Sequence, residues 1–162
     1  IRLTEFSIAK YDEVRNIYTT EIFSSGRSVH VGLDIGGPVG TPIMSVADGR
    51  VAFSGYNAAD GDYGHPVIVH HSIQGHDLWI LYGHLSADST ANCPAGRSIS
   101  KAEVIAWIGA EDENGGWPPH LHFQLSLLRP HTHDLPGVVH PDDRERALKD
   151  FPDPLKVLGP LY

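Results

Sequence analysis

The sequence predicts an all-β fold: an antiparallel β-sheet sandwich with a groove, short flanking helices and a proline-rich C-terminal tail. Segments rich in β-branched and aromatic residues recur at short intervals along the centre of the chain, separated by turn pairs such as Asp48-Gly49 and Asn114-Gly115. None of these segments is followed by a helix long enough for a crossover, so a parallel βαβ fold is not expected.

The expected elements follow the chain from its N-terminus. A short helix is expected around Tyr11–Tyr18. The strands expected in the centre are Ile43–Ser54, Pro66–Ser72, Leu78–Gly83, Val104–Gly109 and Leu121–Leu127. Further on, a helix is expected to begin at Pro141 and run through Leu148, because a proline followed by acidic residues favours a helix start.

Length and charge predict one globular domain and exclude some partners. The 162 residues carry 12 Lys and Arg against 20 Asp and Glu, which gives a formal net charge of −8. We expect a single domain over residues 1–162, with a β core at about 27–128, an N-terminal flank at 1–26 and a C-terminal appendage at 129–162. The chain lacks the basic stripe that binds phosphates, so neither nucleic acid nor a membrane is expected as a partner.

Two histidines, His120 and His122, stand two residues apart in the last expected strand. Alternation along a strand places both on one polar face with Gln124 and Ser126, while Phe123 and the leucines face the core. Two imidazoles about 6 to 7 Å apart on one strand face can serve one metal site. A pair of surface histidines is the alternative for this segment alone.

A second cluster is His30-Val31-Gly32-Leu33-Asp34. A helix would bring His30 and Asp34 to one metal, but the β-branched neighbours and a following glycine pair oppose a helix. In an ideal strand their Cα atoms would lie roughly 13 Å apart, near the limit for sharing one ion. We expect Gly32 to bend the chain and so bring the two side chains together. A strand-end histidine and a turn aspartate are the structural alternative.

A third motif, Tyr82-Gly83-His84-Leu85, places a histidine at the end of an expected strand with no acidic residue nearby in sequence. Two histidines and an acid are the ligands of a catalytic zinc with an open fourth position, and two further histidines are then available to handle protons. Trp117 and Tyr63 fall in expected loops and are candidates for the walls of a groove.

In their order along the chain, the motifs His30-x-x-x-Asp34, Tyr82-Gly83-His84-Leu85 and His120-x-His122 resemble the zinc metallopeptidases of the M23 or lysostaphin/LytM type, which cleave peptide cross-bridges of bacterial cell walls. The resemblance covers residues 27–127 approximately. It implies a LytM-type, duplicated-hybrid-motif-like fold and a Zn²⁺-dependent endopeptidase. It also implies that His30, Asp34 and His122 are zinc ligands and that His84 and His120 are the catalytic pair.

This division of roles suits the chemistry of the side chains. An aspartate and two neutral imidazoles complete a tetrahedral zinc site with water in the fourth place, and the metal lowers the pKa of that water from about 15.7 towards about 7. His84 and His120 would then take its proton and stabilise the oxyanion. The sequence does not distinguish which of the two is the general base.

A narrower resemblance comes from residues 114–124 together with Tyr18-Thr19-Thr20 and Phe151-Pro152-Asp153-Pro154. They are similar to the M23-like module between a kinase-like domain and a class III aminotransferase in certain multidomain bacterial proteins. This implies covalently linked partner domains, a small amide as the substrate and a cytoplasmic setting, whereas a typical cell-wall peptidase works outside the cytoplasm.

The chain begins with Ile rather than Met, as expected for a processed form or an excised module. A non-catalytic binding module is a further alternative, but such a copy would be expected to have lost ligands.

Overall fold

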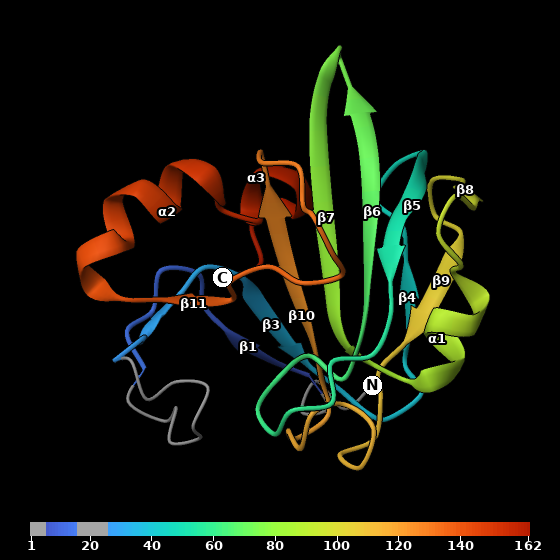
Figure 1. Cartoon of the computed structure of the whole chain (residues 1–162), viewed down its shortest axis with the longest axis horizontal. Helices are drawn as coiled ribbons and strands as arrows, with labels where there is room; N and C mark the ends of the chain where they lie inside the picture. Colours follow the sequence, from blue (N-terminus) through green and yellow to red (C-terminus); the bar gives the residue numbers. More distant parts are fainter. Residues whose placement is uncertain (1–5, 16–25) are drawn as a thin grey trace.

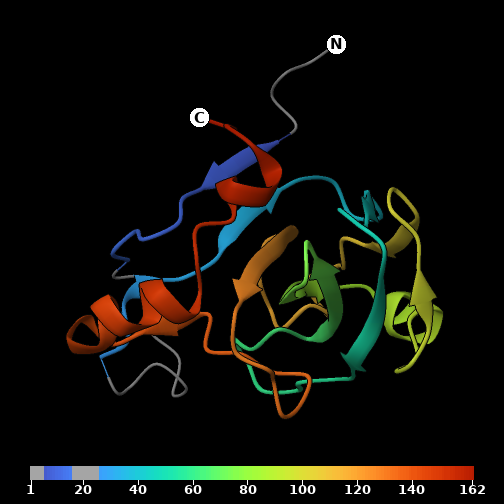
Figure 2. The same ribbon diagram turned by 90° about the horizontal axis from the view of Figure 1, so that it is seen from above.

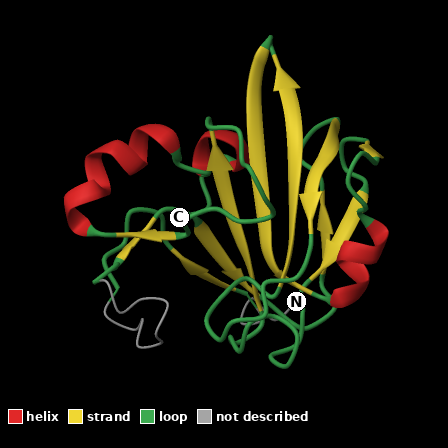
Figure 3. Cartoon of the chain, viewed as in Figure 1, coloured by secondary structure: helices red, strands yellow, loops and turns green. Residues whose placement is uncertain are grey.

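A seven-stranded antiparallel sheet organises the described part of the chain, residues 6–15 and 26–162 of this computed structural model (Figures 1 and 3). Its strand order is β1-β3-β10-β7-β6-β5-β8. In chain order these strands are β1 (Ser7–Ala9), β3 (Leu33–Gly36), β5 (Gly49–Ser54), β6 (His65–Ile73), β7 (His76–Leu85), β8 (Ser98–Ile99) and β10 (His120–Ser126). The prediction of an antiparallel all-β fold is confirmed.

Smaller elements flank this sheet. Two short strand pairs lie outside it: β2 (Val29–His30) with β11 (Val138–Val139), and β4 (Pro42–Met44) with β9 (Val104–Trp107). The helices are α1 (Ala87–Asn92), α2 (Arg144–Asp150), which follows a 3₁₀ turn at Pro141–Asp143, and α3 (Leu155–Leu158). None of the helices in the described ranges is long and apolar enough to cross a membrane.

The sheet is covered on both faces, so the structure has two hydrophobic cores. One core contains Phe123 and Leu125 of β10 and is closed by residues of β9 such as Ile105. The other contains Ile68 and Leu81 of the long β6–β7 hairpin and is closed by Leu135, Val139, Ala147 and Phe151 of the C-terminal appendage. Figure 2 shows α2 on one side of the central strands and β9 with α1 on the opposite side. The site described below lies on the face that the appendage covers.

The prediction of one continuous strand over Ile43–Ser54 is wrong, because this segment forms two separate strands. The chain leaves the small β4–β9 sheet at Met44 and enters the main sheet at Gly49 as β5. Ser45 marks the break: its backbone N–H still donates to Glu103, the residue before β9, while its hydroxyl turns the chain by donating to the Ala47 carbonyl (2.8 Å). One apolar run therefore serves two sheets.

The helix expected around Tyr11–Tyr18 is wrong over its described part, and residues 16–18 lie outside the described ranges. Tyr11 and Asp12 form a turn and Val14 makes an isolated bridge with Val29. The backbone N–H of Asp12 donates to the His30 carbonyl (2.9 Å), so tertiary hydrogen bonds replace those of a helix. The C-terminal helix is confirmed as the 3₁₀ turn at Pro141 that continues into α2.

The alternation of β10 gives a test of the core with an internal control. Leu125 is 1% exposed within the first core, whereas Leu127 lies just beyond the strand end and is 52% exposed, so its expected place on the core face is also wrong. We expect Leu125→Ala to lower the free energy of unfolding by about 2 to 5 kcal/mol. Leu127→Ala should change it by no more than about 0.5 kcal/mol. Urea denaturation measures both, and equal losses would contradict this assignment of the core.

Candidate metal centre and groove

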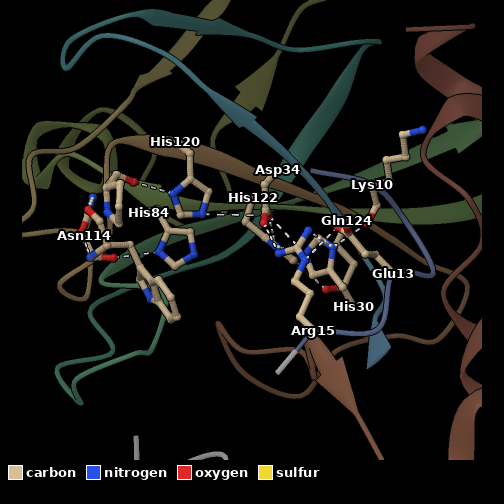
Figure 4. A network of polar contacts seen from close by, with 12 residues as sticks. Lys10, Glu13, Arg15, His30, Asp34, His84, Asn114, His120, His122 and Gln124 are labelled. Carbon is tan, nitrogen blue, oxygen red and sulfur yellow. Dashed lines mark hydrogen bonds and ion pairs between the residues drawn. The ribbon is translucent and has the colours of Figure 1, made fainter. Parts of the chain in front are cut away.

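Three side chains from separate strands converge on one point. His30 ends β2, Asp34 lies in β3 and His122 lies in β10, directly opposite Asp34 in the antiparallel register. Asp34 Oδ1 lies 2.9 Å from His122 Nδ1 and 3.2 Å from His30 Nε2, and the two imidazole nitrogens are 3.2 Å apart. All three side chains are buried. The structure thus brings together the two motifs that contain the expected ligands (Figure 4).

Gly32 makes this convergence possible. The chain bends at Gly32, between β2 and β3, as the sequence predicts. The bend lets His30 and Asp34 approach, and the absence of a side chain leaves room for the third residue. A Cβ atom at Gly32 would lie 2.4 Å from Cε1 of the His122 ring. The glycine is therefore required by close packing of the His122 ring.

The three atoms fit a zinc ion. Zinc binds imidazole nitrogen at about 2.0 to 2.1 Å and carboxylate oxygen at about 2.0 to 2.2 Å, so neighbouring ligand atoms of a tetrahedral site lie about 3.3 to 3.5 Å apart. The separations of 2.9 to 3.2 Å found here are only slightly shorter. Two imidazoles and one carboxylate also leave a fourth position open, as catalytic zinc sites do. The donor set and its spacing agree with the expected Zn²⁺ cofactor.

Arg15 of the N-terminal flank contacts the same cluster. Its Nη1 donates to Asp34 Oδ2 (2.7 Å), and its Nη2 lies 3.0 Å from His30 Nδ1. The backbone carbonyl of Lys10 is also within 3.1 Å of His30 Nδ1. Nδ1 thus faces both a donor, Arg15, and an acceptor, Lys10. A hydrogen on Nδ1 that is donated to Lys10 leaves Nε2 bare towards Asp34, whereas an Nδ1 that accepts from Arg15 leaves the hydrogen on Nε2. Burial alone would raise the pKa of the Asp34 carboxyl, but its interactions with the neighbouring His30 and His122 hold it well below its usual value.

His84 and His120, the expected catalytic pair, lie next to each other beside the ligand cluster. Their ring centroids are 4.4 Å apart, and His120 Nε2 lies 4.0 Å from Asp34 Oδ1. Each ring donates from Nδ1 to a backbone carbonyl, His84 to Asn114 (2.7 Å) and His120 to Pro118 (2.6 Å). Nε2 is therefore the bare nitrogen in both neutral rings. His84 has a left-handed backbone (φ 61°), a strained conformation that is common at functional sites.

Both of these histidines are neutral near pH 7. Burial lowers the pKa of His84 well below its usual value, and the neighbouring His120 and His122 lower it further. Burial also lowers the pKa of His120, although Asp34 opposes this change. Two neutral imidazoles with bare Nε2 atoms can accept a proton at the site.

A cavity of about 830 Å³ opens over these residues. Trp117 and Tyr63 line it, as expected for groove walls, and the C-terminal appendage forms part of its border from Arg129 to Val138. The Tyr63 hydroxyl donates to the Leu135 carbonyl (2.9 Å), which ties one wall to the appendage. A cavity of this size accommodates several residues of an extended peptide.

Sequence reasoning missed the polar groups that surround the five histidine and aspartate residues. Arg15 was missed because the N-terminal flank was expected to be helical. A backbone carbonyl such as that of Asn114 cannot be predicted as a contact from the sequence, because every residue type has one. Gln124 is different, because alternation placed it on the polar face with His122. Its Oε1 lies 2.9 Å from His122 Nε2.

The fold and the site together define a metal-dependent hydrolase domain, with an open ligand position beside two neutral histidines and under a groove. The family model of Peptidase family M23 matches residues 28–133. The chain belongs to this family.

Relatives and solved structures agree with this assignment. The chain is 35% identical over 99 residues to the DD-carboxypeptidase/endopeptidase Mpg of Neisseria meningitidis, a match that covers 61% of this chain and 20% of that protein. It is 32% identical over 112 residues to the peptidoglycan DD-endopeptidase ShyC of Vibrio cholerae, covering 66% of this chain and 23% of that protein. The chain thus spans about a fifth of the length of these relatives.

The fold is similar to that of the catalytic domain of lysostaphin from Staphylococcus simulans. The TM-score is 0.59 at 18% identity, and the alignment covers 87% of this chain and 92% of that domain. At this level of identity the comparison shows the shared fold, which confirms the expected lysostaphin/LytM architecture.

Gly32→Ala tests the packing that brings the ligands together. The added methyl group would press on the His122 ring, so we expect zinc affinity to fall by about 10- to 100-fold, the usual cost of disturbing the support of a metal ligand. Gly37→Ala is the matched control, because a Cβ there would meet the exposed ring of Phe6 instead of the site. Competition with a chelator measures both affinities. Equal affinities in the two variants would show that the His122 ring does not depend on Gly32.

Proposed function

We propose that this chain is a zinc endopeptidase domain that cleaves peptide bonds in peptidoglycan. In this proposal His30, Asp34 and His122 hold the zinc ion, and His84 and His120 act on the substrate bond. The single observation that carries it is the convergence of three ligand atoms within 3.2 Å of one another, beside two neutral histidines.

Zinc bound to these residues supplies Lewis-acid activation of water and of the scissile carbonyl. The remaining work falls to the chain's own side chains. His84 and His120 offer two bare Nε2 atoms at the floor of the groove, so one can accept a proton during attack and one can return a proton to the leaving amine. Their backbone acceptors, the carbonyls of Asn114 and Pro118, stabilise each ring once it becomes positively charged.

The choice of substrate follows the relatives. The ShyC relative is a peptidoglycan DD-endopeptidase, and the Mpg relative is a DD-carboxypeptidase and endopeptidase. A peptidoglycan substrate places this domain outside the cytoplasm. The wide groove lined by Trp117 and Tyr63 suits an extended peptide better than a small amide, which would leave most of the cavity unfilled.

We also propose that the β core and its two flanks act as one domain over residues 1–162. Two contacts support this. The Tyr11 hydroxyl of the N-terminal flank donates to the Phe151 carbonyl of the C-terminal appendage (2.7 Å). The backbone N–H of Val31, one residue beyond the ligand His30, donates to the Gly137 carbonyl (3.0 Å).

Metal analysis of four variants tests the proposed roles. Wild type should contain about one zinc ion per chain, which His122→Ala and Asp34→Ala should lose together with activity. His84→Ala should keep its zinc and lose turnover of purified muropeptides by about 10²- to 10⁴-fold, the usual contribution of acid–base catalysis. His70→Ala is the control, because His70 lies on β6 and pairs with Asp77 away from the groove, so it should keep both zinc and turnover.

Two outcomes would count against the proposal. Equal loss of zinc in His122→Ala, Asp34→Ala and His84→Ala would refute the division into ligands and catalytic residues. Absence of zinc from the wild type, even after reconstitution at neutral pH, would refute a zinc peptidase.

A further inference from the structure

Gln124 joins the candidate metal centre to the C-terminal appendage. It lies in β10 two residues after His122, and its side chain is fully buried. Both ends of its amide group have a partner. Oε1 lies 2.9 Å from His122 Nε2, and Nε2 of Gln124 donates to the Pro136 carbonyl (3.2 Å). Figure 4 shows Gln124 beside His122, on the side away from His84.

The partner at Pro136 fixes the direction of every hydrogen bond in this chain of contacts. A backbone carbonyl only accepts, so the NH₂ group of Gln124 faces Pro136 and its carbonyl oxygen faces His122. That oxygen also only accepts, so His122 carries a hydrogen on Nε2. In a neutral imidazole the other nitrogen, Nδ1, is then bare. This bare Nδ1 is the atom that lies 2.9 Å from Asp34 Oδ1, and two acceptors at this distance are stabilised by a cation between them.

We propose that Gln124 is a positioning residue that holds His122 in the tautomer with Nδ1 free for zinc, and that the Pro136 carbonyl holds Gln124 in turn. The inference rests on the proposed function, because it takes His122 as a zinc ligand. Hydrogen bonds to the second nitrogen of a ligating histidine fix its ring and raise its basicity, and their loss typically weakens metal binding.

The position of the Pro136 carbonyl is itself built by the fold. Three consecutive carbonyls of the appendage each accept a hydrogen bond from a different part of the site: Leu135 from the Tyr63 hydroxyl, Pro136 from Gln124 and Gly137 from the Val31 N–H. The close approach requires Gly137, because a Cβ there would lie 2.3 Å from the Tyr63 hydroxyl oxygen. These residues lie beyond residue 133, where the match to the family ends. The appendage thus supplies one layer of support that the matched segment does not contain.

Two substitutions at Gln124 separate positioning from packing. Gln124→Met keeps the length of the side chain and removes both hydrogen bonds. We expect it to weaken zinc affinity by about 10- to 100-fold. Gln124→Glu keeps an oxygen that accepts from His122 and should recover most of that loss. Chelator competition on the whole chain measures these affinities with zinc alone, independently of activity.

Ser126→Ala is the matched control. Ser126 is buried on the same face of β10, and its hydroxyl bonds only to the backbone of Leu128 in the described structure. This variant should lose stability in urea without losing zinc affinity. If Gln124→Met binds zinc as tightly as Ser126→Ala does, Gln124 has only a packing role and the inference is overturned.

Nitrogen-15 NMR of the His122 ring in the metal-free protein at pH 8 distinguishes failure of this inference from failure of the proposed function. We expect a hydrogen on Nε2 in the wild type and a shift towards Nδ1 in Gln124→Met. A wild type that shows this tautomer but binds no zinc would refute the proposed function and support the role of Gln124 in orienting His122. The same tautomer in wild type and Gln124→Met would show that Gln124 does not set the tautomer of His122, whether or not zinc binds.

Discussion

The pairing register between β3 and β10 is the constraint on which the site depends. It places His122 opposite Asp34, while the pairing of β10 with β7 places the same residue opposite Gly83, next to His84. Two of the candidate ligands and one of the catalytic candidates are thus aligned by backbone hydrogen bonds. A slip of one residue would turn every side chain of β10 to the other face. The apolar side of β10, which includes Phe123 and Leu125, opposes such a slip because it fills the first core. The stability of the core and the geometry of the site therefore have the same cause.

The histidine rings are also oriented by hydrogen bonds of the ring nitrogens that face away from the site. In each of the four histidines that nitrogen has an oxygen acceptor: Lys10 for His30, Asn114 for His84, Pro118 for His120 and Gln124 for His122. Three of these acceptors are backbone carbonyls, which cannot become donors by rotation of a side chain. The neutral rings of His84, His120 and His122 consequently present lone pairs to the centre, where a cation and a proton in transfer need them. His30 does so when its Nδ1 donates to Lys10 and does not accept from Arg15. Gln124 is the exception, since an amide can flip, and the Pro136 carbonyl removes that freedom.

The contrast between local sequence patterns and contacts distant in sequence explains how much could be predicted from the sequence. Alternation along 120–127 and the bend at Gly32 depend on local patterns, so the strand of His122 and the approach of His30 to Asp34 followed from them. That His122 joins these two residues was implied by the resemblance to the M23 peptidases. The break at Ser45 separates pairing with β9, which is distant in sequence, from pairing within the main sheet, and an unbroken apolar run gives no sign of it. The N-terminal helix failed for the same reason, because contacts with residues near 28–30 replace local propensity. Every residue type has a backbone carbonyl, so only the structure shows which carbonyls accept hydrogen bonds at the site.

The C-terminal appendage has a place in the site that its proline-rich sequence does not reveal. Val138 pairs with His30 through β11 and β2, and the neighbouring carbonyls support Tyr63, Gln124 and Val31. These bonds form only after the end of the chain has returned to the face of the sheet where His122 lies. A ligand that binds the folded state alone shifts the folding equilibrium towards that state. A metal ion that binds the completed cluster more tightly than the unfolded chain therefore also stabilises the packing of the C-terminal appendage against this face of the sheet. Closure of the groove wall and formation of the metal centre are therefore thermodynamically linked, although the paired residues His30 and Val138 lie 108 positions apart.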